Sequence, residues 1–61
     1  MTTGEFKKLI RRKGCTFVSH GGKHDLWMNS KNGKTTRIGR HDGKELPAGT
    51  VDSMLKDLGL K

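Results

Sequence analysis

Apolar residues recur every three or four positions near the start of the chain, as in a helix with one buried side. These positions are Phe6, Leu9 and Ile10. Thr2 and Glu5 match the T-x-x-E pattern of a capping box, which satisfies free backbone N–H groups at a helix start. Gly14 is typical of the residue that follows a helix end. The pattern predicts a helix over residues 3–13.

Three short segments rich in β-branched and aromatic residues follow, and turn sequences separate them. We expect strands over residues 15–20, 24–29 and 34–39. Residues 21–23 read GGK, and residues 30–33 read SKNG, whose Asn-Gly pair is a strong hairpin signal. Because such short connections join antiparallel neighbours, the segments should form an antiparallel meander.

A second amphipathic pattern lies near the end of the chain. Thr50 is a suitable N-cap, Asp52 would stand in the first turn, and Gly59 ends the pattern. Its apolar positions are Val51, Met54, Leu55 and Leu58. Together the elements predict one α+β domain over residues 1–61 in the order α-β-β-β-α. Both short helices can cover one face of a three-stranded antiparallel sheet, so we expect the other face to stay open to solvent or to a partner.

The core should combine both helical stripes with alternate positions of the sheet. The candidates in the strands are Cys15, Phe17, Leu26, Met28 and Ile38. Trp27 stands between two of these candidates, so we expect its ring on the open face. There it would stack on RNA bases or contact a partner protein, unless it is a partly buried aromatic residue. Cys15 is the single cysteine, which excludes an intrachain disulfide and favours a role as a small core residue.

Charge narrows the choice of partner. Thirteen lysine and arginine residues oppose six aspartate and glutamate residues, giving a formal net charge of +7. A small domain with this excess is suited to a polyanion, with nucleic acid as the first candidate. No apolar run could cross a bilayer and the first residues lack a signal peptide's apolar segment, so we expect a cytoplasmic protein without a membrane role. The basic residues of the first helix form either a phosphate-binding face or plain solvated charge. They are Lys7, Lys8, Arg11 and Arg12.

The sequence SHGGKHDLW, residues 19–27, places two glycines ahead of a histidine. Glycine permits tight turns and lets a ligand approach the main chain, which makes Gly22 a candidate contact. His24 follows at the start of a strand, where it would be held in place and exposed. Histidine is the side chain whose ordinary pKa suits proton transfer near neutral pH. His24 is therefore a candidate general base. The same sequence pattern also fits an ordinary surface histidine.

RNA carries its own nucleophile, the 2′-OH, beside each phosphate. A ribonuclease that uses it needs a base, cations for the developing charge and an acid for the leaving 5′-oxygen. His24 would supply the base, and Lys23 or Arg40 the cation. The acid stays open among His20, His41 and Lys23. This chemistry needs no cofactor, and the spacing of the possible zinc ligands matches no common structural site, so we expect no metal. Those ligands are Cys15, His20, His24 and His41.

The whole pattern resembles the HicA family, whose members are messenger-RNA interferases of type II toxin–antitoxin pairs. The likeness rests on KGCTFVSHGGKHDLW, on the Asn-Gly hairpin before KTTRI, and above all on KELPAGTVDSMLKDLGL. It implies a double-stranded-RNA-binding-domain-like fold, a catalytic histidine at His24 after Gly22, and a HicB-like antitoxin that covers the active site. The toxin would be a monomer alone and a hetero-oligomer with its antitoxin. Cys15 replaces the family's usual aromatic residue, and Lys23 its usual serine.

The first functional hypothesis is a metal-independent endoribonuclease toxin that acts on mRNA. The alternative is a non-catalytic RNA-binding module, because the implied fold is shared with domains that bind duplex RNA by shape. Such domains usually carry lysines at the start of the last helix, where this chain reads TVDSML. A protein-interaction domain with incidental charge is a third hypothesis, and it predicts no salt-dependent affinity for RNA.

Overall fold

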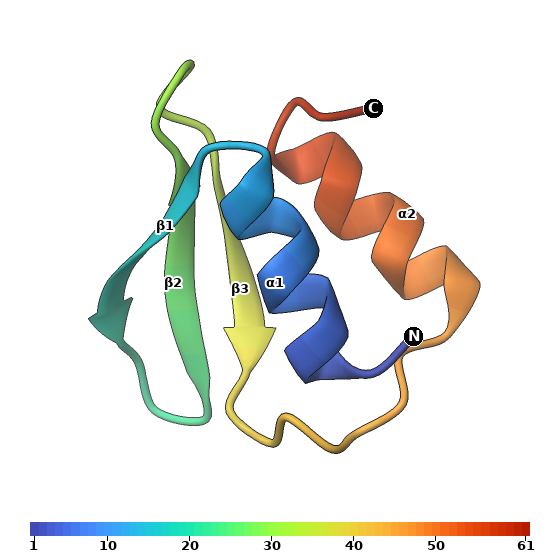
Figure 1. The fold of residues 1–61 in the computed structure, drawn as a ribbon. Helices are drawn as coiled ribbons and strands as arrows, with labels where there is room; N and C mark the ends of the chain where they lie inside the picture. Colours follow the sequence, from blue (N-terminus) through green and yellow to red (C-terminus); the bar gives the residue numbers. More distant parts are fainter.

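The computed structural model describes all residues, 1–61, and arranges them as a helix, three strands and a helix (Figure 1). The elements are α1 (Thr3–Arg12), β1 (Cys15–His20), β2 (His24–Asn29), β3 (Thr35–Gly39) and α2 (Ala48–Asp57). The predicted α+β fold and the order α-β-β-β-α are confirmed, and the strand bounds differ from the prediction by at most one residue. Neither helix has the length and apolar character needed to cross a membrane.

The three strands form one antiparallel sheet in the order β1-β2-β3, as predicted. Phe17 of β1 pairs with Trp27 of β2, and the register then shifts, which leaves Val18 in a β-bulge. On the other side of β2, His24 pairs with Gly39 of β3. β1 and β3 are therefore the two edges of the sheet, and His24 begins its central strand.

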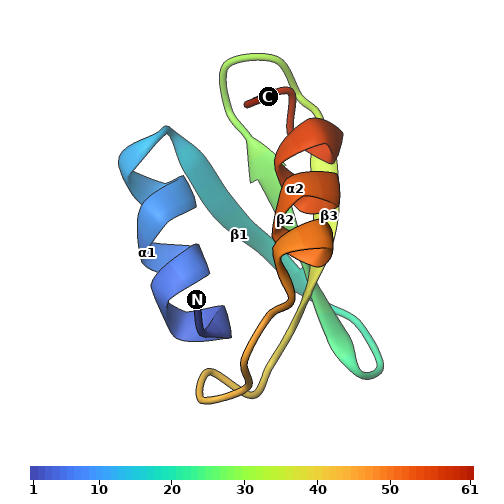
Figure 2. The ribbon, with the colours of Figure 1, turned by 90° about the vertical axis from the view of Figure 1, so that its right-hand side faces the viewer.

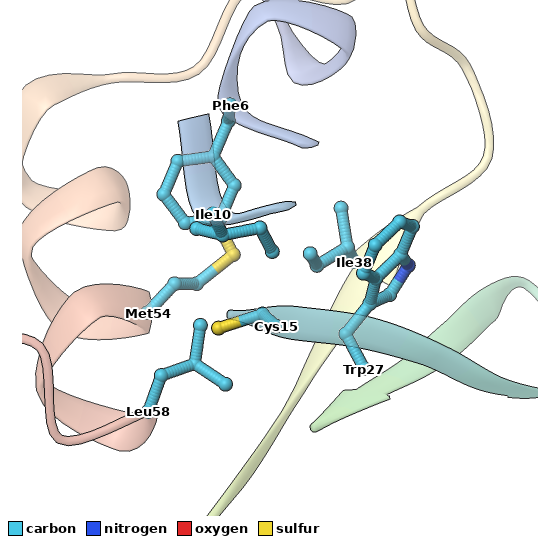
Figure 3. Packing of buried hydrophobic residues seen from close by; sticks show 7 residues of the cluster. All are labelled: Phe6, Ile10, Cys15, Trp27, Ile38, Met54 and Leu58. Atoms are coloured by element: carbon cyan, nitrogen blue, oxygen red, sulfur yellow. The ribbon is translucent and has the colours of Figure 1, made fainter. Parts of the chain in front are cut away.

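Both helices bury their apolar stripes against one face of the sheet and run side by side (Figures 1 and 2). Buried apolar residues from the helices and all three strands meet in one cluster (Figure 3). Its members are Phe6, Ile10, Cys15, Trp27, Ile38, Met54 and Leu58. The predicted burial of Cys15 is confirmed, and Leu9, Val51 and Leu55 are half-buried. Fully burying a large apolar side chain contributes roughly 1.5–3 kcal/mol, so this cluster is the main driving force for folding.

The prediction that Trp27 faces the open side of the sheet is wrong. Its ring is 2% exposed and lies in the core (Figure 3), whereas Leu26 and Met28 are half-buried on the other face. The sequence LWM has consecutive apolar residues, so alternation alone does not decide which of them faces the helices. Asp25 and Asn29 share the face of Trp27, and both find hydrogen-bond partners there. Because these polar neighbours are satisfied, the core can take the largest ring of the chain.

Helix α1 begins with the predicted capping box. Thr2 Oγ1 accepts a hydrogen bond from the Glu5 N–H at 3.2 Å, and Glu5 Oε1 accepts one from the Thr2 N–H at 2.7 Å. The helix ends at Arg12, one residue before the predicted end, and the N–H of the following Lys13 bonds back to Ile10.

Helix α2 begins earlier than predicted. Its first residue is Ala48 and its N-cap is Pro47, so Thr50 lies within the first turn and does not cap the helix. The Pro47 carbonyl accepts a hydrogen bond from the Val51 N–H at 3.1 Å, so the backbone becomes helical before Thr50 is reached. Proline costs little at this boundary because the first N–H groups of a helix have no partner within it.

The loop between β3 and α2 is fastened to the start of α1 and passes below it in Figure 2. The Thr3 N–H donates to the Lys44 carbonyl at 2.8 Å, and the Gly4 N–H donates to the Asp42 carbonyl at 2.9 Å. These N–H groups have no acceptor inside the helix, so the loop satisfies them. Lys7 Nζ adds an ion pair with Asp42 Oδ1 at 2.7 Å. The loop is therefore fixed to the fold and holds its side chains beside the sheet.

Candidate active site

His24 stands at the first position of β2, opposite Gly39 of β3. Its side chain is exposed, and its ring lies close to Gly39, where an added Cβ would be 3.8 Å from Cδ2. The preceding turn fixes its backbone, because the Gly21 N–H donates to the His24 carbonyl at 2.9 Å. A Cβ at Gly21 would collide with that carbonyl oxygen, so the turn requires glycine. The turn thus holds a histidine at the end of the sheet with its imidazole open to a ligand.

A groove of about 910 Å³ lies beside His24, between β3, the loop that follows it and the start of α2. Its ionisable residues of basic type are Lys23, His24, Arg37, Arg40, His41 and Lys44. The acidic residue among its walls is Glu45, and that carboxylate is paired with the N-terminal ammonium group of Met1. The groove therefore carries an excess of positive charge, which attracts phosphate groups.

Asp25 is buried on the helix side of the sheet and joins its two outer strands. Asp25 Oδ1 accepts hydrogen bonds from His20 Nδ1 at 2.8 Å and from Arg40 Nε at 2.9 Å. Arg40 also donates through Nη2 to the Gly21 carbonyl. The hydrogen bond from His20, followed by that from Arg40, lowers the pKa of Asp25 from its ordinary value of 3.8. The ionised Asp25 carboxylate therefore braces the turn that precedes His24.

His20 points to the opposite face of the sheet from His24, because it pairs with Asp25 and shares its side. The proton between them belongs to His20 Nδ1, since a carboxylate can only accept. The His20 ring meets Phe17 edge-on, with ring centroids 4.8 Å apart. The prediction of Phe17 as a core residue is wrong, because its side chain is 39% exposed on the edge strand. Trp27 already fills the core beside it and contacts it edge-on, with centroids 6.1 Å apart.

The structure brings together part of the predicted RNA-binding set. The members that line the groove beside His24 are Gly22, Lys23 and Arg40. The basic residues of α1 do not line it, and they are Lys7, Lys8, Arg11 and Arg12. Lys7 is paired with Asp42, and the Arg11 guanidinium lies over the Trp27 ring, 5.1 Å from its centroid. The basic face of α1 is therefore separate from the groove.

Sequence reasoning missed Arg37 and Lys44, which add two cations to the groove. A signal for Arg37 exists in the sequence, since it alternates with Ile38 in β3 and must face away from the core. Lys44 gives no such signal, because its position depends on how the loop docks on α1. Of the candidate acids, His41 and Lys23 line the groove and His20 does not.

The candidate zinc ligands do not come together. Cys15 is buried in the core, and this burial raises the pKa of its thiol. His20 and His24 point to opposite faces of the sheet. No group of three histidine, cysteine, aspartate or glutamate side chains is arranged to hold a metal ion.

Comparison with known proteins shows the family of the chain. The family described as "HicA toxin of bacterial toxin-antitoxin" matches residues 4–60 of the chain. The chain is 36% identical over 61 residues to a protein of Pseudomonas fluorescens (strain Pf0-1) named "Probable mRNA interferase HicA". That alignment covers 100% of this chain and 98% of the relative. No solved structure matches the chain. Since the family match spans nearly every residue, the chain belongs to the HicA toxin family.

Proposed function

We propose that this chain is an endoribonuclease toxin that cleaves mRNA, with His24 as its general base. The observation that carries the proposal is the exposed imidazole of His24 in the wall of a groove rich in lysine and arginine. The family match and the mRNA interferase name of the Pseudomonas relative support the same activity. The formal net charge of +7 supports a polyanionic substrate.

The reaction follows from what RNA already contains. His24 takes the proton of a 2′-OH, and the freed oxygen attacks the adjacent phosphorus. The bond to the 5′-oxygen then breaks, leaving a 2′,3′-cyclic phosphate on one product and a 5′-hydroxyl on the other. Because the substrate supplies the nucleophile, we propose a reaction without a metal or a cofactor. General-base catalysis of this kind contributes about 10²- to 10⁴-fold to the rate.

We assign to Lys23 and Lys44, two cations of the groove, the role of binding the RNA phosphate at the cut site. A cation beside the phosphate stabilises the negative charge that develops as the 2′-oxygen attacks. The Arg40 guanidinium is already bonded to Asp25 and to the Gly21 carbonyl, and the Asp25 carboxylate balances its charge. We therefore assign to Arg40 the role of holding the turn, with its remaining N–H groups available to RNA.

A HicB-like antitoxin is the proposed protein partner. The family description refers to toxin–antitoxin pairs, and the basic charge of this chain suits an acidic protein. An antitoxin seated over the groove would keep RNA away from His24. We propose a monomeric toxin that forms a hetero-oligomer with its antitoxin and acts in the cytoplasm, where mRNA is translated.

The test compares the native chain with His24→Ala and with His20→Asn, using mixed RNA in buffer with and without EDTA. His20→Asn is a matched control, because its side-chain amide can still donate to Asp25 while the imidazole is lost. We expect the native chain and His20→Asn to yield fragments with cyclic phosphate ends. His24→Ala should bind RNA but cut it at least about 10²-fold more slowly.

Three results would contradict the proposal in different ways. Full cleavage by His24→Ala would remove His24 as the base. RNA binding without cleavage by any of the chains would indicate a non-catalytic RNA-binding module instead. Cleavage that disappears only when EDTA is present would contradict the metal-independent reaction.

A further inference from the structure

A second histidine, His41, lines the same groove as His24 and has no role in the proposed base step. The two come from neighbouring places in the fold. Gly39 lies directly across the ladder from His24, and His41 follows Gly39 by two residues. Each step between consecutive Cα atoms is about 3.8 Å, and paired residues of antiparallel strands are about 4.5–5.5 Å apart. The two Cα atoms are therefore within about 13 Å of each other, and both histidines line the same groove, so one substrate bound there can reach both.

His41 is held in place although it lies in a loop. Its carbonyl accepts a hydrogen bond from the Lys44 N–H at 3.0 Å, which closes a turn over residues 41–44. The next residue, Asp42, is anchored to α1 by the Gly4 N–H at 2.9 Å and by Lys7 Nζ at 2.7 Å. Proton transfer depends on this kind of positioning, because the donor must reach the leaving oxygen in the transition state.

The other candidate acids fit less well. His20 lies on the opposite face of the sheet and donates its Nδ1 proton to Asp25. Lys23 lines the groove, but an ammonium group is a much weaker acid than an imidazolium group. A general acid must give up its proton readily near neutral pH, which favours imidazolium over ammonium. Lys23 is better suited to hold the phosphate.

We propose that His41 is the general acid that protonates the leaving 5′-oxygen. The inference rests on the proposed ribonuclease function. The 2′-oxygen forms a bond to phosphorus and gives its proton to His24. The bond between phosphorus and the 5′-oxygen breaks, and its electron pair takes the proton of the His41 imidazolium. His24 ends protonated and His41 neutral, and exchange with water restores both before the next turnover.

The test uses a substrate whose leaving group needs no proton. A cut site is first mapped on mixed RNA with the native chain, and two oligoribonucleotides of that sequence are made. One has the natural 5′-oxygen at the cut site, and the other has a bridging sulfur in its place, which leaves as a stable thiolate. The variants are His41→Ala and His41→Gln, because glutamine can hydrogen-bond to phosphate but cannot supply the proton. His24→Ala and His20→Asn are the controls.

On the oxygen substrate we expect both His41 variants to be slower than the native chain by about 10²- to 10⁴-fold. On the sulfur substrate they should return to within about tenfold of the native rate, while His24→Ala stays slow on both because its missing step is the attack. Native speed of the His41 variants on the oxygen substrate would overturn the inference. So would an equal loss on both substrates, which would indicate phosphate binding or a folding defect. No cleavage by the native chain would overturn the proposed function itself, and this result is separate from the other two.

Discussion

Asp25 and Arg40 are joined by a hydrogen bond of 2.9 Å between Oδ1 and Nε, and this contact connects the end of β3 to the turn before His24. Arg40 continues through Nη2 to the Gly21 carbonyl, and the Gly21 N–H donates to the His24 carbonyl at 2.9 Å. These hydrogen bonds connect Asp25, through Arg40 and Gly21, back to His24, its neighbour in β2. Asp25 is therefore connected to the backbone of the turn before His24, although the side chains of Asp25 and His24 point to opposite faces of the sheet.

The Asp25→Asn chain should cut RNA more slowly while binding it about as well. The amide keeps the size of the carboxylate, but it leaves the Arg40 guanidinium without its counter-charge and loosens the turn. Small displacements of a reacting group can cost up to about 10²-fold in rate, so we expect kcat to fall towards that limit with little change in KM. The measurement is steady-state cleavage of an oligoribonucleotide. A rise in KM at constant kcat would instead assign Asp25 and Arg40 to substrate binding.

Acid should weaken the fold partly through the same residue. The pKa of Asp25 in the folded chain lies below its ordinary value of 3.8, chiefly because His20 donates to it. Because the pKa is lower in the folded chain than in the unfolded chain, the ionised carboxylate stabilises the fold at any pH above the ordinary pKa. This stabilisation is lost as the pH falls through the lowered pKa of the folded chain. Thermal unfolding of the native chain and of Asp25→Asn should therefore differ most at neutral pH and converge below about pH 4.

The groups Glu5 and Asp52 also have lowered pKa values, so the native chain loses stability in acid for more than one reason. Both residues are present in Asp25→Asn, so their contribution cancels in the comparison. A difference between the two chains that stays constant from pH 7 to pH 3 would mean that the charge of Asp25 is not what stabilises the fold.

The core contains one polar group without a partner. The Trp27 Nε1–H is buried and donates no hydrogen bond. Leaving a buried donor unsatisfied costs about 1–3 kcal/mol, so Trp27→Phe removes a penalty while it loses ring volume. We expect these effects to offset each other to within about 1.5 kcal/mol, whereas Trp27→Ala should cost about 3–5 kcal/mol. Urea unfolding measures both values, and equal losses in the two variants would show that Nε1 contributes a favourable contact.

Local signals made most of the fold predictable. The T-x-x-E box at Thr2 and the Asn-Gly turn at Gly33 act over a few residues, and both appear in the structure where the sequence placed them. Gly33 has a φ of +74°, a backbone conformation that favours glycine over other residues. The orientation of Trp27 was not predictable in the same way. Both of its sequence neighbours are apolar, so the alternation of apolar and polar residues does not show which face of the sheet each of the three side chains occupies. That orientation depends on the shape of the space between the sheet and the helices.

The candidate site was predictable only where it is continuous in sequence. Lys23 and His24 are adjacent, and the glycine turn before them marks their position. The brace from Asp25 to Arg40 spans 15 positions, and it exists only because the ends of the strands meet. Lys44 reaches the groove through the docking of its carbonyl on Thr3. Contacts of this kind depend on tertiary structure, so they cannot be predicted from the periodicity of the sequence.

The groove and the basic face of α1 can be distinguished by their effect on the salt dependence of RNA binding. Lys44→Ala and Lys8→Ala each remove one exposed positive charge, so they change the net charge of the chain equally. Lys44 lines the groove and Lys8 does not. The backbone contact between Lys44 and Thr3 is kept in the alanine variant, so the loop should stay docked.

We expect Lys44→Ala to weaken RNA binding and to lower the slope of log K against log salt by about 0.7, the value for one phosphate contact on a single strand. Lys8→Ala should leave that slope unchanged, because a charge that contacts no phosphate releases no counterion. The measurement is titration of a single-stranded RNA at several salt concentrations, with His24→Ala as the background so that the RNA is not cut. If Lys8→Ala lowers the slope and Lys44→Ala does not, RNA lies along α1, and the basic residues of that helix are a phosphate-binding face after all.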